Sequence, residues 1–168
     1  MYLKMKKMSE VKIKMIRDYP IKETSPFTNK YVSKDKMLSV SVLPNRTSPR
    51  TRDITNTHRV EKDEIVGIIT QHLQENLGIA LSGLNIFKFI YNNLEKTKKG
   101  YKLKFKMNFE ECRESNGYVS TQSVWHGLAE LLDKDIIART KIPGTYFLNP
   151  NFFIPTNTIS VTEHYKLT

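Results

Sequence analysis

Several features that would place this 168-residue chain in a familiar structural class are missing from it. It has a single cysteine, Cys112, so an intrachain disulfide cannot form, as is typical of proteins from a reducing compartment. No apolar run approaches the roughly 20 residues of a membrane-spanning helix. The lysine-containing N-terminus also lacks the continuous apolar core of a signal peptide. We therefore expect a cytoplasmic protein with no membrane partner.

The motifs of common enzymes and metal proteins are missing as well. No glycine-rich loop is present to cradle the phosphates of a nucleotide. Cys112 has only Arg113 as a cationic neighbour, which favours a small buried residue over a nucleophile. The four histidines are far apart and show no metal-ligand spacing: His58, His72, His126 and His164. We expect no enzymatic activity, no cofactor and no metal site.

What the chain has in excess is positive charge. Its 27 Lys and Arg against 17 Asp and Glu give a net charge of +10 and a pI of about 9.6. Such a balance suits a polyanion, most often nucleic acid, although a basic protein without a specific partner stays open. Residues 1–60 carry 14 Lys and Arg against five acidic residues, and residues 96–106 carry six against none. The excess therefore lies in an N-terminal region and in one short central segment.

Residues 1–60 are predicted to form a basic N-terminal extension that is partly β or flexible. Prolines and turn-forming residues interrupt it. The alternation in residues 36–43 predicts a strand, and residues 53–60 are its expected partner. Such an extension either tracks DNA phosphates or is a solvated tail, and both readings stay open. Residues 156–168 are expected to be a C-terminal tail.

Residues 61–155 have clearer patterns. Apolar spacing predicts a helix over 61–77 that ends at Gly78, and a second helix capped by Ser82. Alternation over 101–107 predicts one strand with its lysines turned away from the core. A short helix begins at Asn108, and after a turn a longer helix runs from Ser120 to about Lys134. A strand from residue 136, a turn at residues 143–144 and a return strand to residue 150 complete the region.

From residue 82 the expected order is helix, strand, helix, turn, helix, strand, hairpin, strand. This is the order of the winged helix-turn-helix, in which the third helix enters the major groove and the hairpin lies along the adjacent backbone. The predicted fold class is α+β, with a winged helix-turn-helix core in residues 61–155, an additional preceding helix and the basic extension. A winged-helix module that binds protein instead of DNA stays open.

Candidate DNA contacts follow from this order. The helix from residue 120 has no Lys or Arg before residue 134, but glutamine can read adenine and hydroxyls can bond bases or phosphates. Trp125 either joins the core or borders the same face. The polar candidates on the helix are Ser120, Thr121, Gln122, Ser123 and His126. The expected phosphate anchors are Arg139, Lys141, Gly144 and Thr145 in the hairpin, and Lys98, Lys99, Lys102 and Lys104 in the central basic segment.

The segment from Gly127 to Phe153 resembles the C-terminal half of the RepL-type plasmid replication proteins. The resemblance rests on Leu-Ala-Glu-Leu at 128–131, Ile-Ile-Ala-Arg-Thr at 136–140 and Tyr-Phe-Leu-Asn-Pro-Asn at 146–151. It extends over about residues 54–154, and many relatives have basic residues where this chain has Trp125 and His126. The resemblance implies a non-enzymatic winged-helix protein that binds double-stranded DNA at a plasmid origin and starts or supports replication.

The sequence leaves two questions about role and partners open. A winged-helix transcriptional regulator would bind DNA through the same fold as an origin-binding protein, so the sequence pattern does not distinguish the two roles. The apolar face of the 61–77 helix would pack either against the core of the same chain or against a second copy in a homodimer. Host replication proteins are further partners that a plasmid replication protein would meet.

Overall fold

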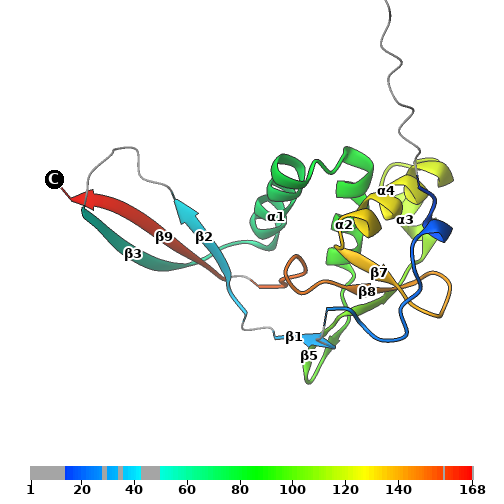
Figure 1. Ribbon diagram of the computed structural model, residues 1–168, viewed down its shortest axis with the longest axis horizontal. Helices are drawn as coiled ribbons and strands as arrows, with labels where there is room; N and C mark the ends of the chain where they lie inside the picture. The colour runs from blue at the N-terminus through cyan, green and yellow to red at the C-terminus, as the bar shows by residue number, and fades with distance from the viewer. Residues whose placement is uncertain (1–13, 28–29, 34–35, 43–49, 157, 168) are drawn as a thin grey trace, which may run out of the picture.

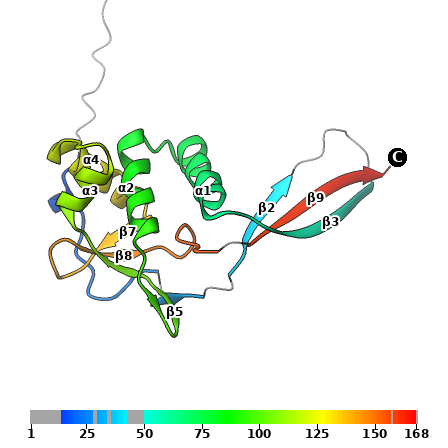
Figure 2. The same ribbon diagram turned by 180° about the vertical axis from the view of Figure 1, so that it is seen from behind.

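The computed structural model describes residues 14–27, 30–33, 36–42, 50–156 and 158–167. These residues form a mixed α+β structure in which the helices and two small sheets lie together and a third sheet extends to one side (Figures 1 and 2). The core is formed by apolar side chains from the helices and from the sheet beneath them. The α+β class predicted from the sequence is confirmed. No helix in the described ranges has the length and apolar character to cross a membrane.

The first long helix, α1 (Lys62–Leu77), confirms the prediction for residues 61–77. Two acidic residues lie in its first turn, where the helix dipole favours negative charge. Gly78 ends it in the left-handed conformation, at φ 65°, and donates its amide to the Leu73 carbonyl. Ile65, Ile69 and Leu73 are buried on one side, so the apolar stripe of α1 packs against the core.

The second helix, α2 (Leu81–Asn92), begins earlier than the sequence predicted. Its N-cap residue is Ala80, and Ser82 lies inside the first turn, so the predicted cap is wrong. The cap comes instead from another helix: Glu130 accepts the Ala80 amide through Oε2 at 2.8 Å and the Ser82 hydroxyl through Oε1 at 3.0 Å. A carboxylate at this end also suits the helix dipole.

The next two helices, α3 (Phe109–Ser115) and α4 (Thr121–Asp133), begin where their capping residues predicted. Asn108 Oδ1 accepts the Glu111 amide at 3.1 Å, and Ser120 Oγ accepts the Ser123 amide at 3.1 Å. Between them the chain turns through Gly117, at φ 75°. Local side-chain chemistry therefore sets the start of both helices.

The central sheet has the strand order β6-β8-β7, with both pairs antiparallel. It consists of β6 (Lys104–Lys106), β7 (Ile137–Arg139) and β8 (Thr145–Leu148), so the first strand lies beside the third. The β7–β8 connection is the predicted hairpin, with Gly144 at φ 77° in its turn. Helices α2, α3 and α4 lie beside this sheet in both views (Figures 1 and 2).

The single strand predicted over residues 101–107 is two strands. β5 (Gly100–Lys102) pairs with β4 (Lys96–Thr97) and with β1 (Tyr31–Val32), whereas β6 pairs with β8. The change of partner occurs at the buried Leu103. Its amide donates to the Lys30 carbonyl and its carbonyl accepts the Leu148 amide, each at 3.0 Å. The alternating stretch therefore pairs with β1 and β4 before Leu103 and with β8 after it, and the chain bends at Leu103.

The third sheet has the order β2-β9-β3 and joins residues 38–59 to the C-terminal end of the described chain. It consists of β2 (Leu38–Val42), β3 (Arg50–Arg59) and β9 (Thr158–Leu167). The predicted pairing of residues 36–43 with 53–60 is wrong, because β9 lies between them, parallel to β2 and antiparallel to β3. Residues 158–167, expected in a tail, are therefore the central strand. Alternating apolar residues at 159, 161, 165 and 167 were the sequence signal for it.

Candidate nucleic-acid interface

Helix α4 buries one side and presents the other to solvent. Val124, Leu128 and Leu131 are fully buried, as their helical spacing predicts. Gly127 brings α4 against α2 so closely that a β-carbon there would lie 2.6 Å from the Ser82 carbonyl oxygen. The opposite side is exposed and carries the residues that we call the open face of α4: Thr121, Gln122, Trp125 and His126.

The two serines predicted as contacts have a structural task at the start of α4. Ser120 Oγ accepts the Ser123 amide at 3.1 Å, and the two hydroxyls lie 3.1 Å apart. Their hydroxyls are therefore engaged in the N-cap. Of the polar candidates on this helix, the structure leaves Thr121, Gln122 and His126 as the ones that project from the open face.

Trp125 belongs to the open face rather than to the core. Its side chain is 43% exposed. Its ring lies on that of Phe109, with centroids 4.9 Å apart and planes inclined by 31°. This contact fixes the indole at the start of α3 and leaves the rest of its surface to solvent. The sequence did not decide between the core and the surface for Trp125, and the structure places it at the surface.

A segment far away in the sequence lies against the same helix. We call residues 14–23 the arm; it contains the short helical turn η1 (Ile16–Asp18). Ile16 and Tyr19 pack on the core, and the Tyr19 hydroxyl donates to Asp133 Oδ1 at 3.3 Å. Partial burial, and next the Asp133 charge, raise the pKa of Tyr19. Ala129, one helical turn after Trp125 on α4, is only 7% exposed.

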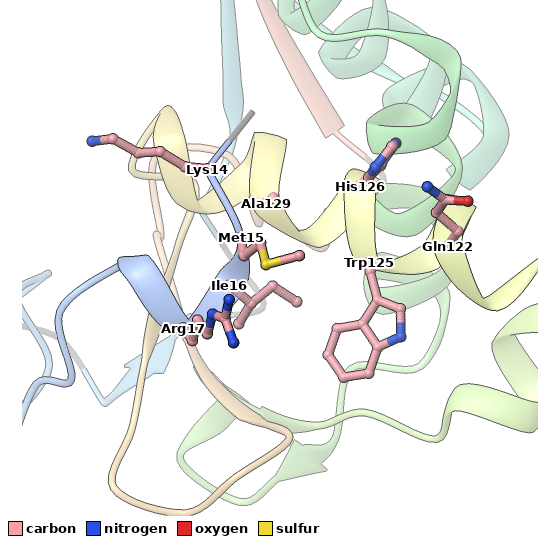
Figure 3. Close-up of a pocket in the computed structure, with 8 residues that line it drawn as sticks. All are labelled: Lys14, Met15, Ile16, Arg17, Gln122, Trp125, His126 and Ala129. Carbon is pink, nitrogen blue, oxygen red and sulfur yellow. The ribbon is translucent and has the colours of Figure 1, made fainter. Parts of the chain in front are cut away.

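The arm and α4 enclose an apolar hollow of about 530 Å³. Its walls are the side chains drawn in Figure 3, four from the arm and four from α4: Lys14, Met15, Ile16, Arg17, Gln122, Trp125, His126 and Ala129. In this view Met15 and Ile16 point toward the side of Trp125, whereas the amino group of Lys14 points away from it. The arm thus extends the surface of the open face. No periodic pattern in residues 14–23 predicts this contact.

The two hairpin cations predicted to hold phosphates are engaged with the arm. Arg139 Nη1 donates to the Tyr19 carbonyl at 2.8 Å and to the Arg17 carbonyl at 3.4 Å. Lys141 Nζ lies 3.0 Å from a carboxylate oxygen of Glu23. In the free protein these side chains bind the chain's own residues, and their role as phosphate anchors stays a prediction.

The other two hairpin candidates are also placed differently from the expectation. Thr145 is 7% exposed, and its carbonyl accepts the Thr140 hydroxyl at 2.9 Å. Its side chain is therefore not positioned to contact a phosphate. Gly144 has a conformational role at the bend, where its positive φ favours glycine. A β-carbon there would lie 3.8 Å from the ring of Phe109, so the turn reaches back toward α3.

A second hollow, of about 420 Å³, lies between the arm and the hairpin. Trp125 and Phe109 form one wall, Ile16, Arg17 and Ile21 another, and residues 139–146 the third. Trp125, Ile16 and Arg17 line both hollows. The open face, the arm and the hairpin therefore form one continuous surface.

The β4–β5 part of the central basic segment lies away from the open face of α4, whereas its last part, β6, pairs with the hairpin strand β8. Lys98 and Lys99 are exposed in the turn between β4 and β5, and Lys99 lies 5.8 Å from the ring centroid of Tyr31. The β5 hairpin lies at the opposite side of the central sheet from α4 in both views (Figures 1 and 2). Lys102 is 3.8 Å from Glu95, and Lys104 lies 5.7 Å from the ring centroid of Phe147. The structure does not bring these four lysines to the open face.

The described ranges contain no group of three or more His, Cys, Asp or Glu placed to hold a metal ion. Cys112 is fully buried, and burial raises the pKa of its thiol. A raised pKa disfavours the thiolate that nucleophilic chemistry needs.

In comparisons with known proteins, no family model, no curated protein and no solved structure matches this chain.

Proposed function

We propose that the protein is a winged-helix protein that binds double-stranded DNA at a plasmid origin and supports replication without catalysing a reaction. Two features of the fold support the winged-helix assignment. Apart from the short strands β4 and β5 after α2, the elements α2, β6, α3, α4, β7 and β8 follow one another in the winged helix-turn-helix order. The first strand of the central sheet, β6, pairs with the last, β8, which is the return strand of the hairpin.

The observation that carries the proposal is the open face of α4. It presents Thr121, Gln122 and His126 on the helix that follows a short turn after α3. These side chains are polar groups that can form hydrogen bonds. Gln122 suits bidentate bonds to the N6 and N7 atoms of adenine in the major groove. A helix of this kind reads bases while other groups hold the backbone.

Charge supports a nucleic-acid partner over a protein one. The chain has a net charge of +10, which favours association with a polyanion. The role at a plasmid origin rests on the resemblance to RepL-type proteins in residues 127–153. That part of the chain includes the C-terminal half of α4, the β7–β8 hairpin and the segment after it.

Binding and footprinting on the native replicon test the proposal. We expect the protein to protect a site at the origin, and its affinity for duplex DNA to fall steeply between about 50 and 200 mM salt, by about 0.9 in the log–log slope per phosphate contact. Protection of promoters alone would replace the replication role with a regulatory one. Affinity that does not change with salt would contradict DNA binding and favour a protein-interaction module.

A single substitution tests whether α4 reads the bases. Gln122→Ala should relax sequence preference at one or two base pairs, because a good bidentate contact is worth about 1–3 kcal/mol of discrimination. Gln74→Ala is the matched control, since Gln74 is exposed on α1. The measurement is fluorescence anisotropy with a set of single-base variants of the protected site. Equal base preferences for the two variants would show that α4 is not the reading helix.

A further inference from the structure

The arm is fixed to the surface of the protein by contacts with both α4 and the hairpin. On the α4 side, Ile16 and Tyr19 pack on the core, and Tyr19 bonds Asp133. On the hairpin side, Ile21 forms a parallel bridge with Arg139. The Lys22 amide donates to the Arg139 carbonyl at 3.0 Å. The arm is therefore an ordered part of the surface beside the open face.

The strongest side-chain tether is Arg139. It is partly buried, and its guanidinium donates to two carbonyl oxygens of the arm, those of Arg17 and Tyr19. Hydrogen bonds from a charged donor are stronger than neutral ones. The Lys141–Glu23 pair is more exposed, at 64% and 79%, so it contributes less. The hairpin cation that sequence alone would assign to a phosphate is thus occupied in holding the arm.

The arm places Lys14 and Arg17 beside α4, which has no cation of its own, and the amino group of Lys14 points away from Trp125. Lys14 and Arg17 are exposed and line the hollow beside Gln122, Trp125 and His126 (Figure 3). Among the described residues neither forms an ion pair with an acidic side chain, and Lys14 lies 5.6 Å from the ring centroid of Tyr19. Helix α4 has no Lys or Arg from Thr121 to Asp133. Backbone anchors for a reading helix must therefore come from neighbouring elements.

We propose that the arm is part of the DNA-binding surface: Lys14 and Arg17 bind phosphates beside the groove that α4 enters, and Arg139 is the positioning residue that holds them there. This rests on the proposed function, because it names the backbone contacts of the same interface. An arm that is already ordered in the free protein loses little conformational freedom on binding.

The test compares two variants with the same loss of charge. Lys14→Ala/Arg17→Ala removes the proposed contacts and keeps the Arg17 carbonyl that Arg139 binds. Lys62→Ala/Lys88→Ala removes two exposed cations elsewhere. Lys88 lies on the far side of α2, since Ile86, two residues earlier, is the residue that faces Gly127 of α4.

We measure the affinity for origin DNA as a function of salt. Loss of two phosphate contacts should reduce the slope of log affinity against log salt concentration by about 1.8. If the two proteins bind equally at 1 M salt, the same relation makes binding by the variant roughly 30-fold weaker at about 0.15 M salt. The control variant should keep the wild-type slope. Equal slopes for the two variants, or tighter binding after the arm cations are removed, overturn the proposal. If the wild-type protein shows no salt-dependent binding, the proposed function fails and this inference fails with it.

A double-mutant cycle tests the positioning role of Arg139. Arg139→Ala should reduce the salt slope in the wild-type background, because the arm is released, and change it little in the Lys14→Ala/Arg17→Ala background. If Arg139 contacted DNA itself, its effect would be the same in both backgrounds, and the positioning role would be refuted. Circular dichroism of all variants checks that the fold is kept, and a purely structural effect would not change the salt slope.

Discussion

Two glycines in the middle of helices give a sharp test of how α4 is held, because the same substitution should have opposite effects at the two sites. At Gly127, in α4, an added β-carbon would lie 2.6 Å from the Ser82 carbonyl oxygen and 2.5 Å from Ile86 Cγ1. The carbonyl is backbone of α2, so it cannot move without shifting that helix. At Gly67, in α1, an added β-carbon meets nothing within 4 Å.

The expected magnitudes follow from these surroundings. Replacing glycine by alanine inside a helix stabilises by up to about 1 kcal/mol, because glycine loses more backbone freedom on folding. Gly67→Ala should show this gain. At Gly127 the gain is opposed by overpacking, which costs about 1–3 kcal/mol. The Gly127→Ala variant should therefore be less stable than the Gly67→Ala variant by about 1–3 kcal/mol.

Urea unfolding followed by circular dichroism measures the free energy of unfolding of both variants under the same conditions. The Gly127 variant should also lose affinity for origin DNA, because α4 must move relative to α2, whereas the Gly67 variant should not. If Gly127→Ala stabilises the protein as much as Gly67→Ala, then α2 and α4 are not in the close contact described above. In that case the direction in which α4 presents its open face is not fixed by α2.

Three further predictions concern the packing around the same elements. Glu130→Ala should reduce the free energy of unfolding by about 0.5–2 kcal/mol, measured in urea, since it removes the carboxylate that caps α2. Burial raises the pKa of Tyr91 from 10.0 to about 12, so the unfolded chain loses this proton first and stability should fall as pH rises from about 10 to 12. Tyr91→Phe should flatten that fall in alkaline urea titrations, and the same change at the exposed Tyr118 should not. Cys112 should resist a thiol reagent in the native protein and react in denaturant, because its sulfur is buried and its pKa raised; rapid native labelling would contradict its placement.

Local signals in the sequence were sufficient for much of the helical region. The capping residues Asn108 and Ser120 and the left-handed Gly78 lie where the sequence predicted, since each acts within one turn of its own position. The helical spacing of buried residues in α1 and α4 was equally readable. Gln122 and His126 were identified correctly as exposed, because the apolar stripe of α4 fixes the opposite side.

Contacts between distant segments were not readable in the same way. Glu130 is an ordinary helical residue in the sequence, and only the packing of α4 on α2 places it at the start of α2. The strand β9 has an alternating pattern, but a pattern does not specify its partners. Its position between β2 and β3 therefore came from the structure. Trp125 could join the core or the surface until its contact with Phe109 was known.

The sequence by itself determined the net charge, the α+β class, the order of the four helices and the hairpin after them, and a polar side of α4 without Lys or Arg. These follow from composition and from periodicities that extend over one or two turns. The tertiary structure alone decided that Arg139 holds the arm and that Lys14 and Arg17 lie beside the open face. The reason is physical: a cation binds whichever acceptor folding brings near it, and the carbonyl of Tyr19 is 120 residues away in the chain.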